Sequence, residues 1–136
     1  MIVIDSSALV EALIRGDTTG KAIRARMAAE DRIHAPTLID YEVTAVLFNL
    51  TRAEKLSLAT TAAALGLLPR LPIERHAVAP ALWRRMHKLY SNLSAYDAAY
   101  VALAEHLGPV PLVTCDGRIS RAGVARCQVE VHAAHN

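Results

Sequence analysis

Short apolar runs that alternate with longer helical segments constrain the fold of this chain more than any other sequence feature. Ile2-Val3-Ile4 is the clearest of them, because it is fully apolar and β-branched and ends abruptly at Asp5. Four more strand candidates follow at wide intervals, near residues 32–35, 70–73, 110–114 and 129–132. Short apolar strands separated by helices form parallel sheets with helices on both faces. The sequence therefore predicts a three-layer α/β/α domain with a central, mainly parallel sheet.

The segments between the strand candidates carry residues that begin and end helices. Helices are predicted over residues 8–15, from Thr18 or Thr19 onward, over 38–51, within 52–68, over 80–90 and from 94 to about 106. The segment 38–51 is apolar on nearly every side, which predicts a buried helix. The segment 16–21 has some likeness to a phosphate-binding loop, but it follows a helix rather than a strand. We interpret it as a connection between two helices.

Composition limits the class of protein. The chain has 136 residues, of which 53% are hydrophobic and 21% charged, so we expect a single domain over residues 1–136. A formal net charge of +2 is too small to indicate a polyanion-binding protein by charge alone. Cys115 and Cys127 form no CxxC pair, which argues against a zinc site or a disulfide framework. The chain shows no signal peptide and no membrane-spanning run, so we expect a cytoplasmic location and no membrane partner.

Four acidic residues stand where an α/β sheet collects its functional groups. Asp5 and Asp116 follow strand candidates, and Glu42 and Asp97 lie near the first turns of the two most apolar helices. The carboxyl ends of parallel strands share one edge of the sheet, so these carboxylates are predicted to converge there. Two like charges about 4 Å apart repel by roughly 4 kcal/mol at an effective dielectric of 20. A hard divalent cation, Mg²⁺ or Mn²⁺, is the natural occupant of such a cluster.

Each acid also has a structural interpretation. Ser94 and Asp97 fit a capping box, Asp116 begins an ordinary turn, and Asp5 can cap the helix that follows it. Glu42 fits such an interpretation least, because the pair Thr37 and Asp40 already supplies a capping acid for its helix. Taken singly, each acid is more often structural, but the four together favour a site.

The remaining polar motifs are weaker. No short ligand spacing such as HxxxH connects the histidines, so a surface or structural role is predicted for each of them: His34, His76, His87, His106, His132 and His135. The segment 83–88 is the most basic stretch of the chain. An amphipathic helix with a solvated face is a better interpretation of it than an RNA-contacting patch.

The chain resembles the PIN-domain ribonucleases, and more narrowly the VapC-type toxins of bacterial toxin–antitoxin modules. The resemblance covers nearly the whole chain. Four motifs carry it: Val3-Ile4-Asp5-Ser6-Ser7-Ala8-Leu9, Tyr41-Glu42-Val43, Leu93-Ser94-Ala95-Tyr96-Asp97-Ala98-Ala99-Tyr100-Val101-Ala102-Leu103-Ala104 and Leu112-Val113-Thr114-Cys115-Asp116. The third motif, joined to the Thr-x-Asp of the fourth, is the most specific.

This resemblance implies a role for each of the four acids. Asp5, Glu42, Asp97 and Asp116 would form a metal site for Mg²⁺ or Mn²⁺, supported through hydrogen bonds by two hydroxyl side chains, Ser6 and Thr114. Asp5 and Asp97 are expected to be direct ligands, and Glu42 and Asp116 to act through water or on a second cation. The implied activity is endoribonuclease cleavage, in which a metal-activated water hydrolyses an RNA phosphodiester. The implied partners are a small cognate antitoxin and a second copy of the chain in a homodimer.

Two other functions are compatible with parts of the sequence. A phosphoryl-transfer α/β domain shares the acid that ends a strand, but the segment after Asp5 lacks the second Asp of a DxD motif. A non-catalytic protein that binds an antitoxin and co-represses transcription would need no working acidic site. Residues 53–80 match none of the motifs above, so we expect dimer contacts or substrate contacts there.

Overall fold

A computed structural model describes residues 1–133. Its five strands form one sheet in the order β3-β2-β1-β4-β5, and all four neighbouring pairs are parallel. The strands are β1 (Ile2–Ile4), β2 (Ile33–Pro36), β3 (Ile73–His76), β4 (Leu112–Thr114) and β5 (Val129–Val131). The predicted parallel sheet is confirmed, and within the described residues it contains no antiparallel strand.

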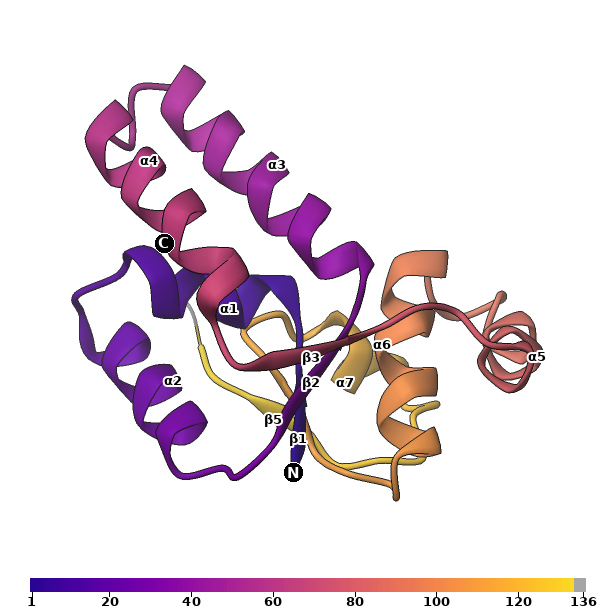
Figure 1. Ribbon diagram of the computed structural model, residues 1–136. Helices are drawn as coiled ribbons and strands as arrows, with labels where there is room; N and C mark the ends of the chain where they lie inside the picture. The colour runs from indigo at the N-terminus through magenta and orange to yellow at the C-terminus, as the bar shows by residue number, and fades with distance from the viewer. Residues whose placement is uncertain (134–136) are drawn as a thin grey trace.

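Seven α-helices and one 3-10 turn connect the strands of the described chain. They are α1 (Ser6–Ile14), α2 (Thr18–Ala28), α3 (Leu38–Arg52), α4 (Leu58–Leu67), the 3-10 turn Leu68–Arg70, α5 (Pro80–Lys88), α6 (Ala95–His106) and α7 (Arg118–Ala122). Figure 1 shows α1 and α2 on one face of the sheet, and α6 with α5 outside it on the other. This arrangement confirms the predicted three-layer α/β/α architecture. None of the described helices combines the length and the apolarity that crossing a bilayer requires.

The central strand β1 fixes the position of the residue that follows it. Ile2, Val3 and Ile4 are completely buried between the two helical layers. Burial of each such side chain contributes about 1.5–3 kcal/mol to folding. Asp5 therefore leaves the sheet at a well-defined point, and α1 begins immediately after it.

The prediction that the third helix is buried is wrong. Helix α3 buries only the face that carries Ile39, Val43 and Leu47, whereas Val46 and Phe48 are exposed. The physical reason is that α3 and α4 form a hairpin that projects beyond the carboxyl edge of the sheet (Figure 1), where only one side of α3 meets the rest of the chain. A helix that is apolar on all sides can be buried by other elements, but the sequence does not show whether the rest of this chain packs against every side.

Smaller differences follow from local contacts. Glu54 has a positive φ of 58°, which interrupts the helical segment predicted over 52–68, so α4 begins only at Leu58. Leu68–Arg70 form the 3-10 turn, so the strand predicted at 70–73 begins only at Ile73 and is β3. Thr37 makes no side-chain cap for α3, because its backbone is helical rather than extended. The carboxylate of its proposed partner Asp40 accepts hydrogen bonds from Arg75 at 3.0–3.3 Å. Helix α7 was not predicted.

Candidate active site

Asp5 lies at the carboxyl end of β1 and caps helix α1. Its Oδ1 accepts hydrogen bonds from the backbone N–H of Ala8 at 3.0 Å and from the hydroxyl of Ser7 at 2.7 Å. Its Oδ2 accepts a hydrogen bond from the hydroxyl of Thr114. The structural interpretation, that Asp5 caps a helix, is therefore correct, and the cap leaves the carboxylate at the edge where the sheet opens.

The end of β4 is joined to the end of β1 through hydroxyl groups. The Thr114 Oγ1 accepts a hydrogen bond from the backbone N–H of Asp116 at 2.9 Å. The Ser7 Oγ accepts one from the backbone N–H of Cys115 at 2.9 Å. These bonds fix the turn after β4, so Asp116 stays close enough to Asp5 for their charges to interact.

Asp97 approaches the same site from the start of α6. Its backbone N–H donates a hydrogen bond to the Ser94 hydroxyl at 3.1 Å, which caps the helix and orients its first turn. The carboxylate is half-buried, and the charges of Arg118 and Asp116 both act on it. Arg118 in turn donates from Nε to Asp116 Oδ2 at 2.6 Å. Asp97 and Asp116 are thus neighbours, and the exposed guanidinium of Arg118 is bonded to Asp116.

Glu42 is held by a buried tyrosine. The Tyr100 hydroxyl donates a hydrogen bond to Glu42 Oε1 at 2.6 Å, which connects α6 to α3 across the site. The negative charges of Glu42 and Asp5 both act on Tyr100, so this residue lies near both carboxylates. The contacts of the four predicted acids therefore lie at the carboxyl edge of the sheet, but no three of their carboxylates place oxygens within 4.8 Å of one another among the described residues.

Burial changes the electrostatics of the acids. Desolvation raises the pKa of Asp5 to about 6, and the charge of Asp116 adds to that effect, although hydrogen bonds from Thr114, Ser7 and Ala8 oppose it. Burial also raises the pKa of Asp97. A carboxylate whose charge is destabilised in this way gains stability from a nearby cation. The set of oxygen donors suits a hard divalent ion such as Mg²⁺ or Mn²⁺, so the residues present fit that group.

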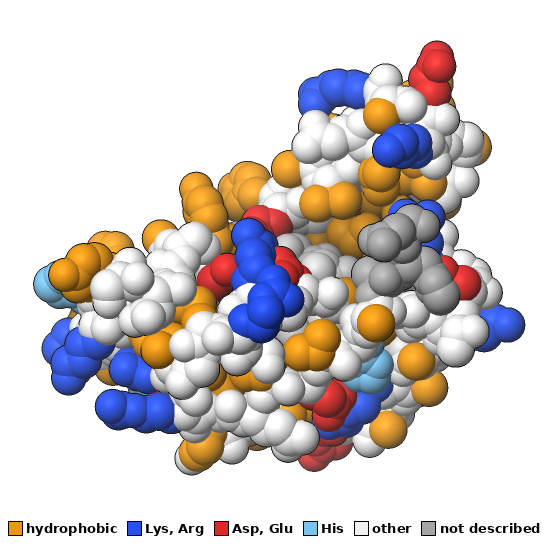
Figure 2. Space-filling model, turned by 180° about the vertical axis from the view of Figure 1, so that it is seen from behind, with side chains coloured by type: hydrophobic (Ala, Val, Ile, Leu, Met, Phe, Trp, Pro, Cys, Tyr) orange, Lys and Arg blue, Asp and Glu red, His pale blue; other side chains and the backbone are white. Residues whose placement is uncertain are grey.

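A groove opens at the base of the α3–α4 hairpin, and of the four predicted acids only Glu42 lines it. Its polar lining includes Ser6, Ser7, Glu42 and Arg118, and its apolar wall comes from α1 and α3. Figure 2 shows acidic side chains grouped beside basic ones in the hollow where the hairpin meets the body of the molecule. The groove thus offers the Arg118 guanidinium for contacts with anionic groups beside Glu42.

Ser6 was predicted from the sequence to support the site, but its neighbour Ser7, whose hydroxyl also contacts the site residues, was not. The hydroxyl that bonds to both Asp5 and Thr114 is that of Ser7, whereas Ser6 lies close enough to hydrogen-bond the Tyr100 hydroxyl. Arg118 and Tyr100 were also not singled out. The Asp-x-Arg spacing of Asp116 and Arg118 is a local signal that was available in the sequence, but nothing in the apolar segment around Tyr100 indicates its contact with Glu42.

Comparison with known proteins decides the family. The profile of the PIN domain matches residues 2–125, which is most of the chain. The chain belongs to the PIN domain family. This PIN domain is 40% identical over 131 residues to ribonuclease VapC9 of Mycobacterium tuberculosis, covering 96% of this chain and 98% of the relative. It is 35% identical to ribonuclease VapC12 of the same organism, covering 98% of this chain and all of the relative. The resemblance drawn from the four sequence motifs is thereby confirmed.

Solved structures support the same fold. The VapC20 toxin of M. tuberculosis, described as cleaving the sarcin–ricin loop, superposes with a TM-score of 0.68 over 90% of this PIN domain and 95% of that chain, at 17% identity. The toxin–antitoxin complex VapBC2 of Rickettsia felis, bound to a DNA fragment of its promoter, superposes with a TM-score of 0.68. The superposition covers 96% of this PIN domain and 98% of that chain, at 12% identity. At these identities the superpositions establish the fold alone.

Proposed function

We propose that this PIN domain is a divalent-metal-dependent endoribonuclease and the toxin of a toxin–antitoxin module. The observation that carries the proposal is the junction of β1 and β4, where Thr114 bonds to both Asp5 and the Asp116 backbone while Asp97 and Glu42 reach the same edge. Kinship with relatives named VapC ribonucleases supports the activity and the toxin role.

The proposed cofactor is Mg²⁺ or Mn²⁺. Asp5 and Asp97 would hold it directly, and Glu42 and Asp116 would act through water or on a second cation. Such a cation lowers the pKa of the water bound to it and neutralises negative charge on a phosphodiester. The raised pKa of the Asp5 carboxyl, caused by burial, supports this role because the charge lacks compensation from the protein alone.

The protein's own residues would position the reactants. In hydrolysis the water oxygen bonds to phosphorus, the phosphorus–oxygen bond to the leaving ribose oxygen breaks, and that oxygen takes up a proton. One carboxylate of the cluster accepts the proton of the attacking water. Arg118 is exposed beside Asp116 and would contact the phosphate, while Ser7 and Thr114 keep Asp5 from rotating.

The proposed partners are an RNA substrate, a small cognate antitoxin and a second copy of the chain. The α3–α4 hairpin supports the protein partners, because Phe48, Leu58 and Leu67 expose large apolar side chains on it. Part of this surface lies in residues 53–80, where contacts with a dimer partner or substrate are expected. Cleavage of cellular RNA would place the activity in the cytoplasm.

Cleavage of total cellular RNA tests the proposed activity. Purified, antitoxin-free protein is incubated with Mg²⁺ or Mn²⁺, and with EDTA in place of the metal, beside an Asp97→Asn variant purified in the same way. We expect discrete fragments that require the metal and are absent with the variant. Fragments that persist with EDTA or with Asp97→Asn would contradict the proposal, and the absence of any cleavage would favour the non-catalytic co-repressor.

A further inference from the structure

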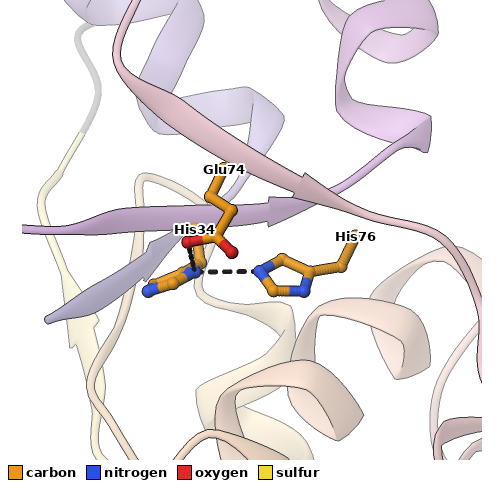
Figure 3. Close-up of side chains that lie close together, drawn as sticks. All are labelled: His34, Glu74 and His76. Atoms are coloured by element: carbon orange, nitrogen blue, oxygen red, sulfur yellow. Dashed lines mark hydrogen bonds and ion pairs between the residues drawn. The ribbon is translucent and has the colours of Figure 1, made fainter.

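Two histidines and a glutamate meet on the sheet, away from the four acids. His34 lies on β2, and Glu74 and His76 lie on the adjacent edge strand β3. The register pairs His34 with Glu74, and side chains two residues apart on a strand share a face, so all three project to the same side. Figure 3 shows both imidazole rings and the carboxylate converging on one point. The two histidines are 42 positions apart in sequence, which is why no ligand spacing was visible.

The donor atoms are close enough to bind a common ion. His34 Nδ1 lies 2.8 Å from His76 Nε2 and 3.4 Å from Glu74 Oε2. All three donor atoms lie within 4.8 Å of one another. Tetrahedral zinc with ligands at roughly 2.0–2.1 Å separates its donor atoms by about 3.3 Å. The facing nitrogens therefore need to part by only about half an ångström, which small rotations of two side chains provide.

We propose that His34, Glu74 and His76 form a second metal site, for a borderline transition ion such as Zn²⁺, distinct from the acidic site. Two imidazole nitrogens and one carboxylate oxygen suit Zn²⁺, whereas Mg²⁺ prefers oxygen donors only. Half of the Glu74 side chain, 52%, is accessible to solvent, so water can occupy a fourth position. The site does not depend on the ribonuclease function proposed above.

The environment of His34 places the polar contacts of the ring on one side. The side chain is only 1% exposed, and its Nε2 has no hydrogen-bond partner among residues 1–133. The polar contacts of this buried ring are thus on its Nδ1 side, with His76 and Glu74. Burial also lowers the pKa of His34.

Arg32 orients the carboxylate without closing the site. It donates a hydrogen bond to Glu74 Oε2 at 2.8 Å, and this contact lowers the pKa of Glu74. This is the same oxygen that lies 3.4 Å from His34 Nδ1, and a carboxylate oxygen keeps a second lone pair for a cation. Because the ligands come from β2 and the edge strand β3, a bound ion would crosslink the edge of the sheet. We therefore expect metal binding at this site to raise the melting temperature.

Cobalt titration tests the site directly, because Co²⁺ in a four-coordinate zinc site absorbs visible light strongly. Tag-free, chelator-treated protein carrying Asp5→Asn and Asp97→Asn is titrated with Co²⁺, and the bound Co²⁺ is then displaced with Zn²⁺. The site variants are Glu74→Gln and His76→Asn in the same background, since both side chains are partly exposed and their replacement spares the core. His106→Asn is the matched control, because this histidine is exposed at the end of α6.

We expect one equivalent of Co²⁺ to give the four-coordinate spectrum, Zn²⁺ to abolish it and excess Mg²⁺ to leave it unchanged. Glu74→Gln and His76→Asn should weaken binding at least about tenfold, while His106→Asn leaves it unchanged. Circular dichroism confirms that each variant is folded. A folded protein without the spectrum, or with a spectrum that survives both site variants, would overturn the proposal and leave His34 and His76 as a hydrogen-bonded pair.

Discussion

The Thr114 hydroxyl donates a hydrogen bond to Asp5 Oδ2, although the two residues are 109 positions apart in sequence. The contact joins the carboxyl ends of the neighbouring strands β1 and β4. It also holds a buried carboxylate in one orientation at the opening of the sheet. The candidate active site is therefore anchored in the core of the sheet and not in a loop, which is how a catalytic group is kept in place.

Replacement of Asp5 by Asn is predicted to stabilise the metal-free protein at neutral pH. The folded-state pKa of Asp5, about 6, lies above the ordinary value of 3.8, so folding favours the protonated carboxyl. This contribution is present in full below pH 3.8 and is lost as the pH rises through about 6. The difference corresponds to at most about 3 kcal/mol at pH 7.

Urea unfolding of parent and Asp5→Asn at pH 4.5 and pH 7.5, both with EDTA, measures this difference. The gain in the free energy of unfolding should be larger at pH 7.5, and Asp31→Asn, at an exposed site, should show no such gain. An Asp5→Asn protein that is less stable than the parent at pH 7.5 would mean that the carboxylate is satisfied by its hydrogen bonds alone.

Tyr100→Phe is predicted to release Glu42. The change removes the hydroxyl that holds Oε1 at 2.6 Å, but it keeps the buried ring. We expect about 1 kcal/mol of lost stability and a 10- to 100-fold lower rate of RNA cleavage. Because Tyr100 is a positioning residue, the Mn²⁺ concentration for half-maximal activity should rise as well. A lower melting temperature with unchanged metal dependence would show that the tyrosine is only structural.

Ser94→Ala is predicted to loosen the start of α6. Its hydroxyl accepts from the Asp97 backbone N–H, and loss of such a cap lowers the free energy of unfolding by about 1 kcal/mol. Ser94→Asp should restore most of the stability, since Asp caps helices as well as Ser does. Thermal unfolding of the parent, Ser94→Ala and Ser94→Asp measures these effects. A Ser94→Ala protein with the melting temperature of the parent would show that α6 is held by its packing alone.

The exposed apolar side chains of the hairpin predict self-association. Phe48 and Leu58 lie on α3 and α4, and replacement of both by Glu should shift a dimeric parent to monomers in sedimentation velocity without loss of stability. Val78→Glu, exposed on the loop before α5, serves as the control. A dimer that persists in the double variant would place the interface elsewhere.

The strands and the acids at their ends could be predicted because both depend on local sequence. Asp5 and Asp116 follow apolar strands, and the edge they share is a general property of parallel sheets. The family resemblance and the signals that begin helices identified Asp97 and Glu42. Ser7 was missed in favour of Ser6, because which of two adjacent hydroxyls faces Asp5 depends on how the helix begins at Asp5.

Two features depended on tertiary arrangement and were not predictable in the same way. The contact between His34 and His76 requires β2 to pair with β3, and the order of strands in a sheet cannot be predicted from the spacing of residues in the sequence. The exposure of Phe48 requires α3 to leave the body of the domain. The prediction for His135 lies outside the described residues.

The rate of RNA cleavage by single acid-to-amide variants tests the central claim most directly. Asp5→Asn, Glu42→Gln, Asp97→Asn and Asp116→Asn are compared with Asp31→Asn, whose side chain is 83% exposed outside the site. One mapped cleavage product is followed in Mn²⁺ with every protein verified as folded. We predict that the Asp5 and Asp97 variants lose more than about 100-fold in rate while Asp31→Asn cleaves like the parent. Parent-like cleavage by either Asp5→Asn or Asp97→Asn would contradict the account.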